Sequence, residues 1–172
     1  MFCDQISIKV IAGPGGNGML HFRREKFRPQ GGPDGGDGGN GGSIIFTTDS
    51  NLNTLASFLS RKIYQAQSGK NGAINDKHGA SATDLLLPVP PGTVIYDENS
   101  GKILADMTDE AGTFVVARGG RGGYGNAHFK GSVRRSPAFA ELGEPGERKN
   151  IRLELRLVAD VGIIGLPSVG KS

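Results

Sequence analysis

Residues 31–42 read GGPDGGDGGNGG, and the glycine pairs in this stretch recur every three residues. The same spacing returns at 119–125, within ARGGRGGYGN, and looser glycine clusters lie at 13–18 and 69–79. A period of three matches the three residues per turn of an extended polyproline-II helix. Where several such helices pack side by side, only glycine fits at the points where two backbones approach closely. The pattern therefore predicts an ordered, glycine-rich sheaf.

A flexible linker is the alternative interpretation of so much glycine, which contributes 29 of the 172 residues against a usual share of about 7%. Two features favour order. The glycine runs fall at four places between strand candidates, not at one domain boundary. The longest run is also punctuated by Pro33, Asp34, Asp37 and Asn40, where a spacer would carry serine.

Short segments with alternating apolar residues lie between the glycine runs and predict β-strands near residues 6–10, 43–48, 93–96, 102–105, 113–117 and 151–157. The two segments at 93–105 flank a turn and predict a hairpin. Three prolines in 85–93 confine that stretch to a sheet edge or a connection. Only 52–59 has an apolar pattern compatible with a helix. The fold class is mainly β, a small barrel or sandwich carrying the sheaf.

The net charge is only +3, but the basic residues are clustered. Between Arg118 and Arg135 there are five cations and no acidic residue. Such local positive fields favour nucleic acid, although a solvated face without a partner remains open. The candidate RNA-contacting residues are Arg23, Arg24, Lys26, Arg28, Arg121, Lys130, Arg134 and Arg135. Aromatic residues make up only 6%, which argues against large stacking platforms for single strands.

The sharpest chemical motif lies at the end of the sequence. Gly165, Leu166, Pro167, Ser168, Val169, Gly170, Lys171 and Ser172 satisfy G-x-x-x-x-G-K-[ST], the phosphate-binding loop, directly after the apolar segment ADVGII. Its backbone N–H groups are expected to face phosphate oxygens, with the Lys171 ammonium on the phosphates and the Ser172 hydroxyl on Mg²⁺.

The sequence stops at Ser172, where the helix of a nucleotide-binding domain should begin. We therefore expect a piece of a longer protein, with one domain at 1–158 and the start of a second at 159–172. No residues remain for a second magnesium ligand or a water-positioning group. We expect no catalytic activity from these residues alone, and no catalytic residue is assigned.

Other features are weaker. His21, His78 and His128 are far apart and lack ligand spacing, so no metal site is predicted. Cys3 is the only cysteine, and neither a secretory signal nor an apolar run of about 18 residues is visible. We expect a cytoplasmic protein without a membrane span.

Several stretches resemble the Obg GTPases. They include FRREKF at 22–27, GGPDGGDGGNGG at 31–42, NLNTL at 51–55, GGRGGYGNAHF at 119–129 and the tail ADVGIIGLPSVGKS. Pro91 and Ser168 depart from the usual family residues without touching the phosphate-contacting positions. The resemblance implies a small β-barrel base carrying a protruding sheaf of left-handed, glycine-rich helices.

By the same resemblance, the parent protein would bind GTP or GDP with Mg²⁺ and hydrolyse GTP slowly. It would act in assembly of the large ribosomal subunit and in growth or stress control, with the sheaf reaching ribosomal RNA. A monomer is expected. Two other roles remain open: a module that binds regulatory proteins without touching RNA, and an intramolecular regulator of the GTPase domain.

Overall fold

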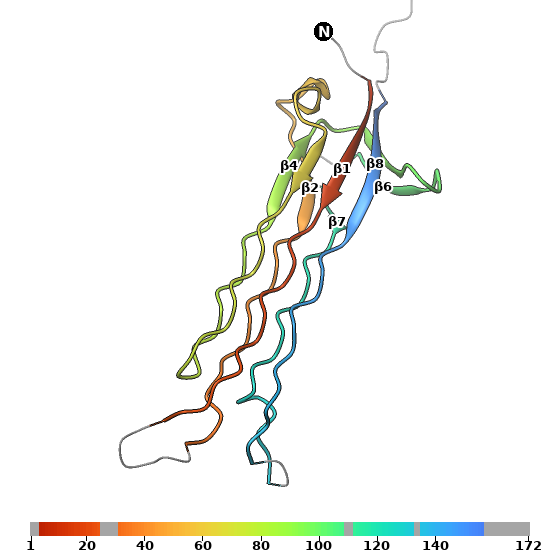
Figure 1. Ribbon diagram of the computed structural model, residues 1–172. Helices are drawn as coiled ribbons and strands as arrows, with labels where there is room; N and C mark the ends of the chain where they lie inside the picture. Colours follow the sequence, from red (N-terminus) through yellow and green to blue (C-terminus); the bar gives the residue numbers. More distant parts are fainter. Residues whose placement is uncertain (1–3, 25–30, 109–111, 133–134, 157–172) are drawn as a thin grey trace, which may run out of the picture.

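The computed structural model describes residues 4–24, 31–108, 112–132 and 135–156. Figure 1 shows a base of β-strands from which long extended segments run side by side to a distal end. We call these segments the stalk and their distal end the tip. No helix in the described ranges has the length and apolar character needed to cross a membrane.

The described residues of the base form two mixed sheets. The larger has the order β3-β1-β8-β5-β6, with β1 at Gln5–Ile11, β3 at Ile63–Gln65, β5 at Thr93–Asp97, β6 at Ile103–Met107 and β8 at Arg148–Leu155. The smaller has the order β4-β2-β7, with β2 at Ile44–Thr48, β4 at Leu85–Val89 and β7 at Thr113–Ala117. Each sheet contains one parallel pair, β1 with β3 and β2 with β4.

The apolar positions of these strands form one core in the base. In β1, alternate residues Ile6, Ile8 and Val10 are buried, as the period of two predicts. They join Ile44 and Phe46 of β2 in a single cluster. The hairpin expected at 93–105 is confirmed by the antiparallel pairing of β5 with β6.

The proline-rich stretch behaves as predicted, because β4 lies at the edge of the smaller sheet, where Pro88 removes no ladder bond toward a further strand. The helix-compatible stretch at 52–59 yields only one turn of 3-10 helix, at Ala56–Phe58. Strand β3 is not predicted from the sequence, since its three residues are too few for a period to show.

Backbone hydrogen bonds along the stalk recur every three residues. The N–H groups of Gly13, Gly16 and Met19 donate to the carbonyls of Gly42, Gly39 and Gly36 at N···O distances of 2.9, 2.8 and 2.9 Å. The same step relates residues 120, 123 and 126 to the carbonyls of residues 13, 16 and 19. This period is that of polyproline-II-like helices and confirms the predicted sheaf. At about 3.1 Å per residue, residues 12–22 extend roughly 30 Å from the base.

Glycine is required because the helices touch through their backbones. A Cβ atom at Gly38 would lie within 3.0 Å of the carbonyl of Gly16, and one at Gly122 equally close to the carbonyl of Gly38. A Cβ at Gly16 would meet the carbonyl of Lys70 in the same way. Several helices are therefore packed so closely that no side chain fits between them.

Candidate nucleic-acid interface

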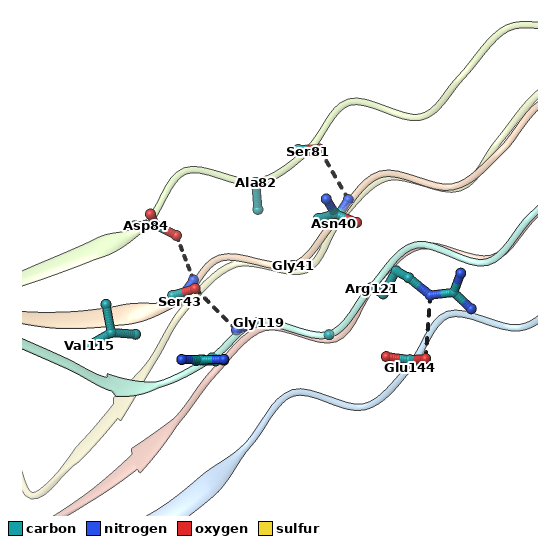
Figure 2. Close-up of a pocket in the computed structure, with 12 residues that line it drawn as sticks. Asn40, Gly41, Ser43, Ser81, Ala82, Asp84, Val115, Gly119, Arg121 and Glu144 are labelled. Carbon is teal, nitrogen blue, oxygen red and sulfur yellow. Dashed lines mark hydrogen bonds and ion pairs between the residues drawn. The ribbon is translucent and has the colours of Figure 1, made fainter.

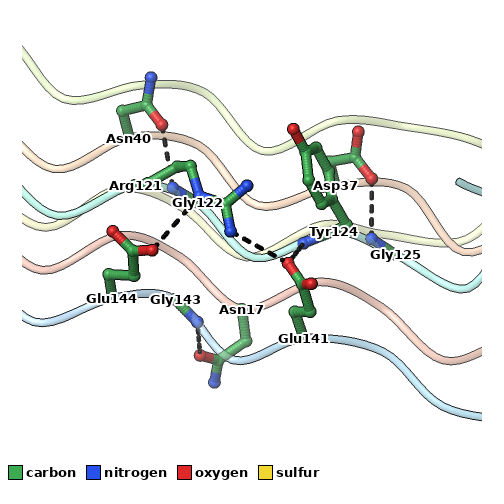
Figure 3. A network of polar contacts seen from close by, with 10 residues as sticks. All are labelled: Asn17, Asp37, Asn40, Arg121, Gly122, Tyr124, Gly125, Glu141, Gly143 and Glu144. Carbon is green, nitrogen blue, oxygen red and sulfur yellow. Dashed lines mark hydrogen bonds and ion pairs between the residues drawn. The ribbon is translucent and has the colours of Figure 1, made fainter.

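The polar residues that punctuate the longest glycine run hold the stalk together. The side chains of Asp37, Asn40 and Ser43 accept hydrogen bonds from the backbone N–H groups of Gly125, Gly122 and Gly119, at 2.7, 2.9 and 3.2 Å (Figures 2 and 3). Their spacing of three places each acceptor on the same side of its helix. These residues satisfy backbone donors that no neighbouring carbonyl reaches.

A second set of side chains does the same on the adjoining helix. His78, Ser81 and Asp84 accept from the N–H groups of Asp37, Asn40 and Ser43, at 3.2, 3.1 and 2.7 Å. Figure 2 shows the last two of these contacts beside an open groove where the stalk joins the base. These groove-lining polar groups therefore serve to bond the backbone of the stalk.

Arg121 lies on the side of the stalk and is paired with two carboxylates. Its guanidinium is 3.3 Å from Glu141 and 3.4 Å from Glu144, and its Cζ is 4.7 Å from the centre of the Tyr124 ring (Figure 3). The arginine and both glutamates are about half exposed. Arg121 therefore clamps two neighbouring helices, and its charge is largely compensated by the chain itself.

Glu147 plays a related role where the stalk meets β8. It accepts from the backbone N–H of Arg118 and from the Lys149 ammonium, both at 3.0 Å. These two contacts, the backbone bond first, hold the pKa of Glu147 below its ordinary value.

Several exposed cations among the described residues gather at the tip. Arg23, Arg24 and Arg135 line one hollow together with Gly31 and Gly32. The Lys130 ammonium lies against Gly32, since it is 3.4 Å from the position that a Cβ there would take. Arg23, Arg24, Arg135 and Lys130 are exposed, and no described carboxylate forms an ion pair with Arg24, Lys130 or Arg135. We call these four residues the tip cations.

Buried polar groups fix the end of the stalk that carries the tip cations. Asn126 is fully buried; its side-chain oxygen accepts from the Gly35 N–H at 2.9 Å and its amide donates to the His21 carbonyl at 2.8 Å. The buried Asp34 carboxylate contacts the His21 ring nitrogen at 2.6 Å. An isolated antiparallel β-bridge also joins Phe22 to Pro33 at this end of the stalk. The tip cations are thus mounted on a fixed frame.

The structure therefore brings together four of the eight residues predicted to contact RNA, and places Arg121 apart from them. Lys26, Arg28 and Arg134 lie outside the described residues, as does the phosphate-binding loop at 165–172. Each described histidine has its own neighbour, with His21 on Asp34, His78 on Asp37 and His128 on Tyr124. A group of aromatic rings near the tip was not predicted from the sequence, although GGYGNAHF places three of them within six residues.

A family model described as GTP1/OBG matches residues 3–157. Among curated proteins, the chain is 53% identical over its whole length to the GTPase Obg of Geobacillus thermodenitrificans. It is 56% identical over 99% of its length to the GTPase Obg of Lactobacillus helveticus, and 55% identical over its whole length to that of Moorella thermoacetica. The chain spans about 40% of the length of these relatives.

Proposed function

This chain belongs to the GTP1/OBG family, and we propose that it is the RNA-docking module of a GTP-hydrolysing protein that acts in large ribosomal subunit assembly in the cytoplasm. The base would support the stalk, and the stalk would project the tip cations into ribosomal RNA. A probe built from close-packed backbones is narrow, so it can enter a crevice that a barrel of ordinary side chains cannot.

The tip cations are the observation that carries this proposal. Three exposed arginines line one hollow about 30 Å from the base, and the Lys130 ammonium lies against Gly32 beside it, while Arg121 on the shaft is paired with Glu141 and Glu144. No described carboxylate forms an ion pair with Arg24, Lys130 or Arg135, and all three lie at the end of the stalk, where a phosphate backbone can approach end-on. Cations of this kind contact phosphates and recognise RNA by its shape, not by base identity.

We further propose that the longer protein binds GTP or GDP through Gly165–Ser172, with Lys171 on the phosphates and Ser172 on Mg²⁺. The motif and the name GTPase Obg of the relatives support this. Residues 159–172 would begin the GTPase domain, and residues 1–158 would form the docking domain, without activity of its own. When bound, Mg²⁺ would neutralise charge on the phosphates.

Co-sedimentation with purified large ribosomal subunits across a salt series tests the docking role. We expect binding that weakens steeply with salt. Substituting Arg24, Lys130 and Arg135 together with alanine should weaken binding uniformly and reduce the slope of log K against log salt by about 2–3. The matched control substitutes Lys62, Lys102 and Arg148, three exposed cations of the base. The proposal fails if binding is independent of salt, or if both triple variants behave alike.

An intramolecular regulatory role is favoured by one feature of the base. On the outer face of the smaller sheet, Leu86, Ile45 and Val115 lie in register across three strands, with Leu86 57% and Val115 44% exposed. This apolar row would suit a contact with the GTPase domain of the same protein. If so, substituting Leu86 and Val115 with aspartate should change the GTP hydrolysis rate of the longer protein. Ile103→Asp, equally exposed on the other sheet, should not.

A further inference from the structure

Four rings gather at the tip end of the stalk, and we call them the ring cluster. The rings of Tyr124 and His128 are stacked, with centres 3.8 Å apart and planes 7° apart. Phe129 meets both edge-on, with centres at 6.2 Å from Tyr124 and 5.6 Å from His128. Phe139 completes the cluster, 4.8 Å from Phe129. Low aromatic content argued against such a platform, but the fold concentrates the few rings available.

A single turn of chain positions the cluster. The N–H groups of His128, Phe129 and Lys130 donate to the carbonyls of Gly125, Asn126 and Ala127, three residues earlier in each case, at 3.2–3.3 Å. A turn of this pitch brings residues three and four apart onto one side, which places His128 over Tyr124. Asn126, within the turn, is anchored to the stalk by its buried amide.

The exposure of the cluster differs from that of a small core. Phe139 is 40% exposed, His128 is exposed, and the neighbouring Leu142 is 77% exposed, whereas Phe46 in the base is fully buried. Rings that served only to hold the tip together would be expected to turn their faces inward. Here an imidazole and a phenyl ring present surface to solvent beside the tip cations.

We propose that the ring cluster receives an unpaired nucleobase, stacked on His128 or Phe139, while phosphates of the same RNA strand lie on the tip cations. The inference rests on the proposed docking function and adds a site to it. Lys130 is two residues beyond His128, and its ammonium lies against Gly32, which lines the arginine hollow. Flat exposed rings next to exposed cations are the combination that binds unpaired RNA, because every base has a face that stacks without regard to sequence.

The test compares two probes of equal charge: a short single-stranded RNA of about nine nucleotides and the same backbone made abasic. Wild-type chain should bind the RNA roughly 5- to 150-fold more tightly than the abasic strand. His128→Ala and Phe139→Ala should reduce that preference without changing the salt dependence. His128→Phe should retain it, because a flat ring remains. Ile103→Ala, an exposed aliphatic residue of the base, should behave as wild type.

Thermal unfolding of each variant checks that the fold is retained. Retained RNA preference in His128→Phe would show that the alanine variant lost binding because it lacks a flat ring. Equal binding of both probes by the wild type would overturn the stacking site but leave docking through cations intact. Unchanged preference in both alanine variants would also overturn it. Failure to bind either probe, while large subunits are still bound, would assign the rings to a protein surface. Failure to bind large subunits as well would end both proposals.

Discussion

Replacing Gly38 with alanine should open the stalk near its middle. A Cβ at this position would lie within 3.0 Å of both the carbon and the oxygen of the Gly16 carbonyl, whereas ordinary contact begins at 3.4 Å. The obstacle is backbone, so no side-chain rotation can relieve the clash. The two helices must move apart.

Moving them apart weakens the hydrogen bonds that meet at this point. Gly38 donates to the Gly123 carbonyl, Gly123 to the Gly16 carbonyl, and Gly16 to the Gly39 carbonyl, at 2.9, 2.9 and 2.8 Å. Overpacking costs about 1–3 kcal/mol, and each backbone hydrogen bond contributes about 0.5–1.5 kcal/mol. The expected loss is about 2.5–7.5 kcal/mol, a large part of the roughly 5–15 kcal/mol that stabilises a whole domain.

Amide hydrogen exchange is the suitable assay, because the stalk can open while the core of the base stays folded. We expect protection to fall at least 10-fold in peptides from residues 12–20, 36–42 and 119–125, and to change little in β1 and β8. Gly131→Ala is the control, since a Cβ there meets nothing within 4 Å and its φ is not positive. It should be neutral or slightly stabilising. Equal protection in the two variants would refute the account of the stalk.

Three further predictions concern single side chains. Asn126→Ala should lower the free energy of unfolding of the tip, measured in urea, by about 2–4 kcal/mol, because it leaves the Gly35 N–H without its acceptor. The control Asn99→Ala, in an exposed turn, should lower it by less than about 0.5 kcal/mol. The pKa of Glu147 is lowered in the folded protein, so its contribution to stability is present above about pH 4.5 and is lost as the pH falls through the folded pKa. Glu147→Gln lacks this carboxylate, so the melting temperature of that variant should fall less steeply below about pH 4.5. In the longer protein, Lys171→Ala should weaken GTP binding, measured with a fluorescent nucleotide, and leave salt-sensitive binding of nucleotide-free protein to large subunits unchanged.

Much of the base could be predicted because its signals are local. The alternation of Ile6, Ile8 and Val10 marks a half-buried strand, and Pro88 marks an edge. Strand β3 could not be predicted, since three residues carry no period and are held by pairing with β1 across more than fifty positions. The parallel pairings within each sheet are likewise absent from any local pattern.

The candidate site was only partly visible in the sequence. The sequence marks clusters of cations but cannot say which of them are already neutralised. Arg121 and Arg135 look alike in a basic run, yet Arg121 faces Glu141 and Glu144 across the stalk while Arg135 lines the tip hollow. The ring cluster could not be predicted for the same reason, because Phe139 meets Phe129, ten positions earlier, only through folding.

The sequence by itself determined that glycine helices of period three would form, because only a residue without Cβ allows two backbones to touch. It also determined the phosphate-binding motif at 165–172, which is a property of spacing alone. The tertiary structure decided which helices are neighbours, since many hydrogen bonds of the stalk, such as those from Gly120 to Gly13 and from Gly38 to Gly123, join residues far apart in the chain. That choice of neighbours makes Asp37 and Asn40 internal acceptors and leaves the tip cations facing solvent.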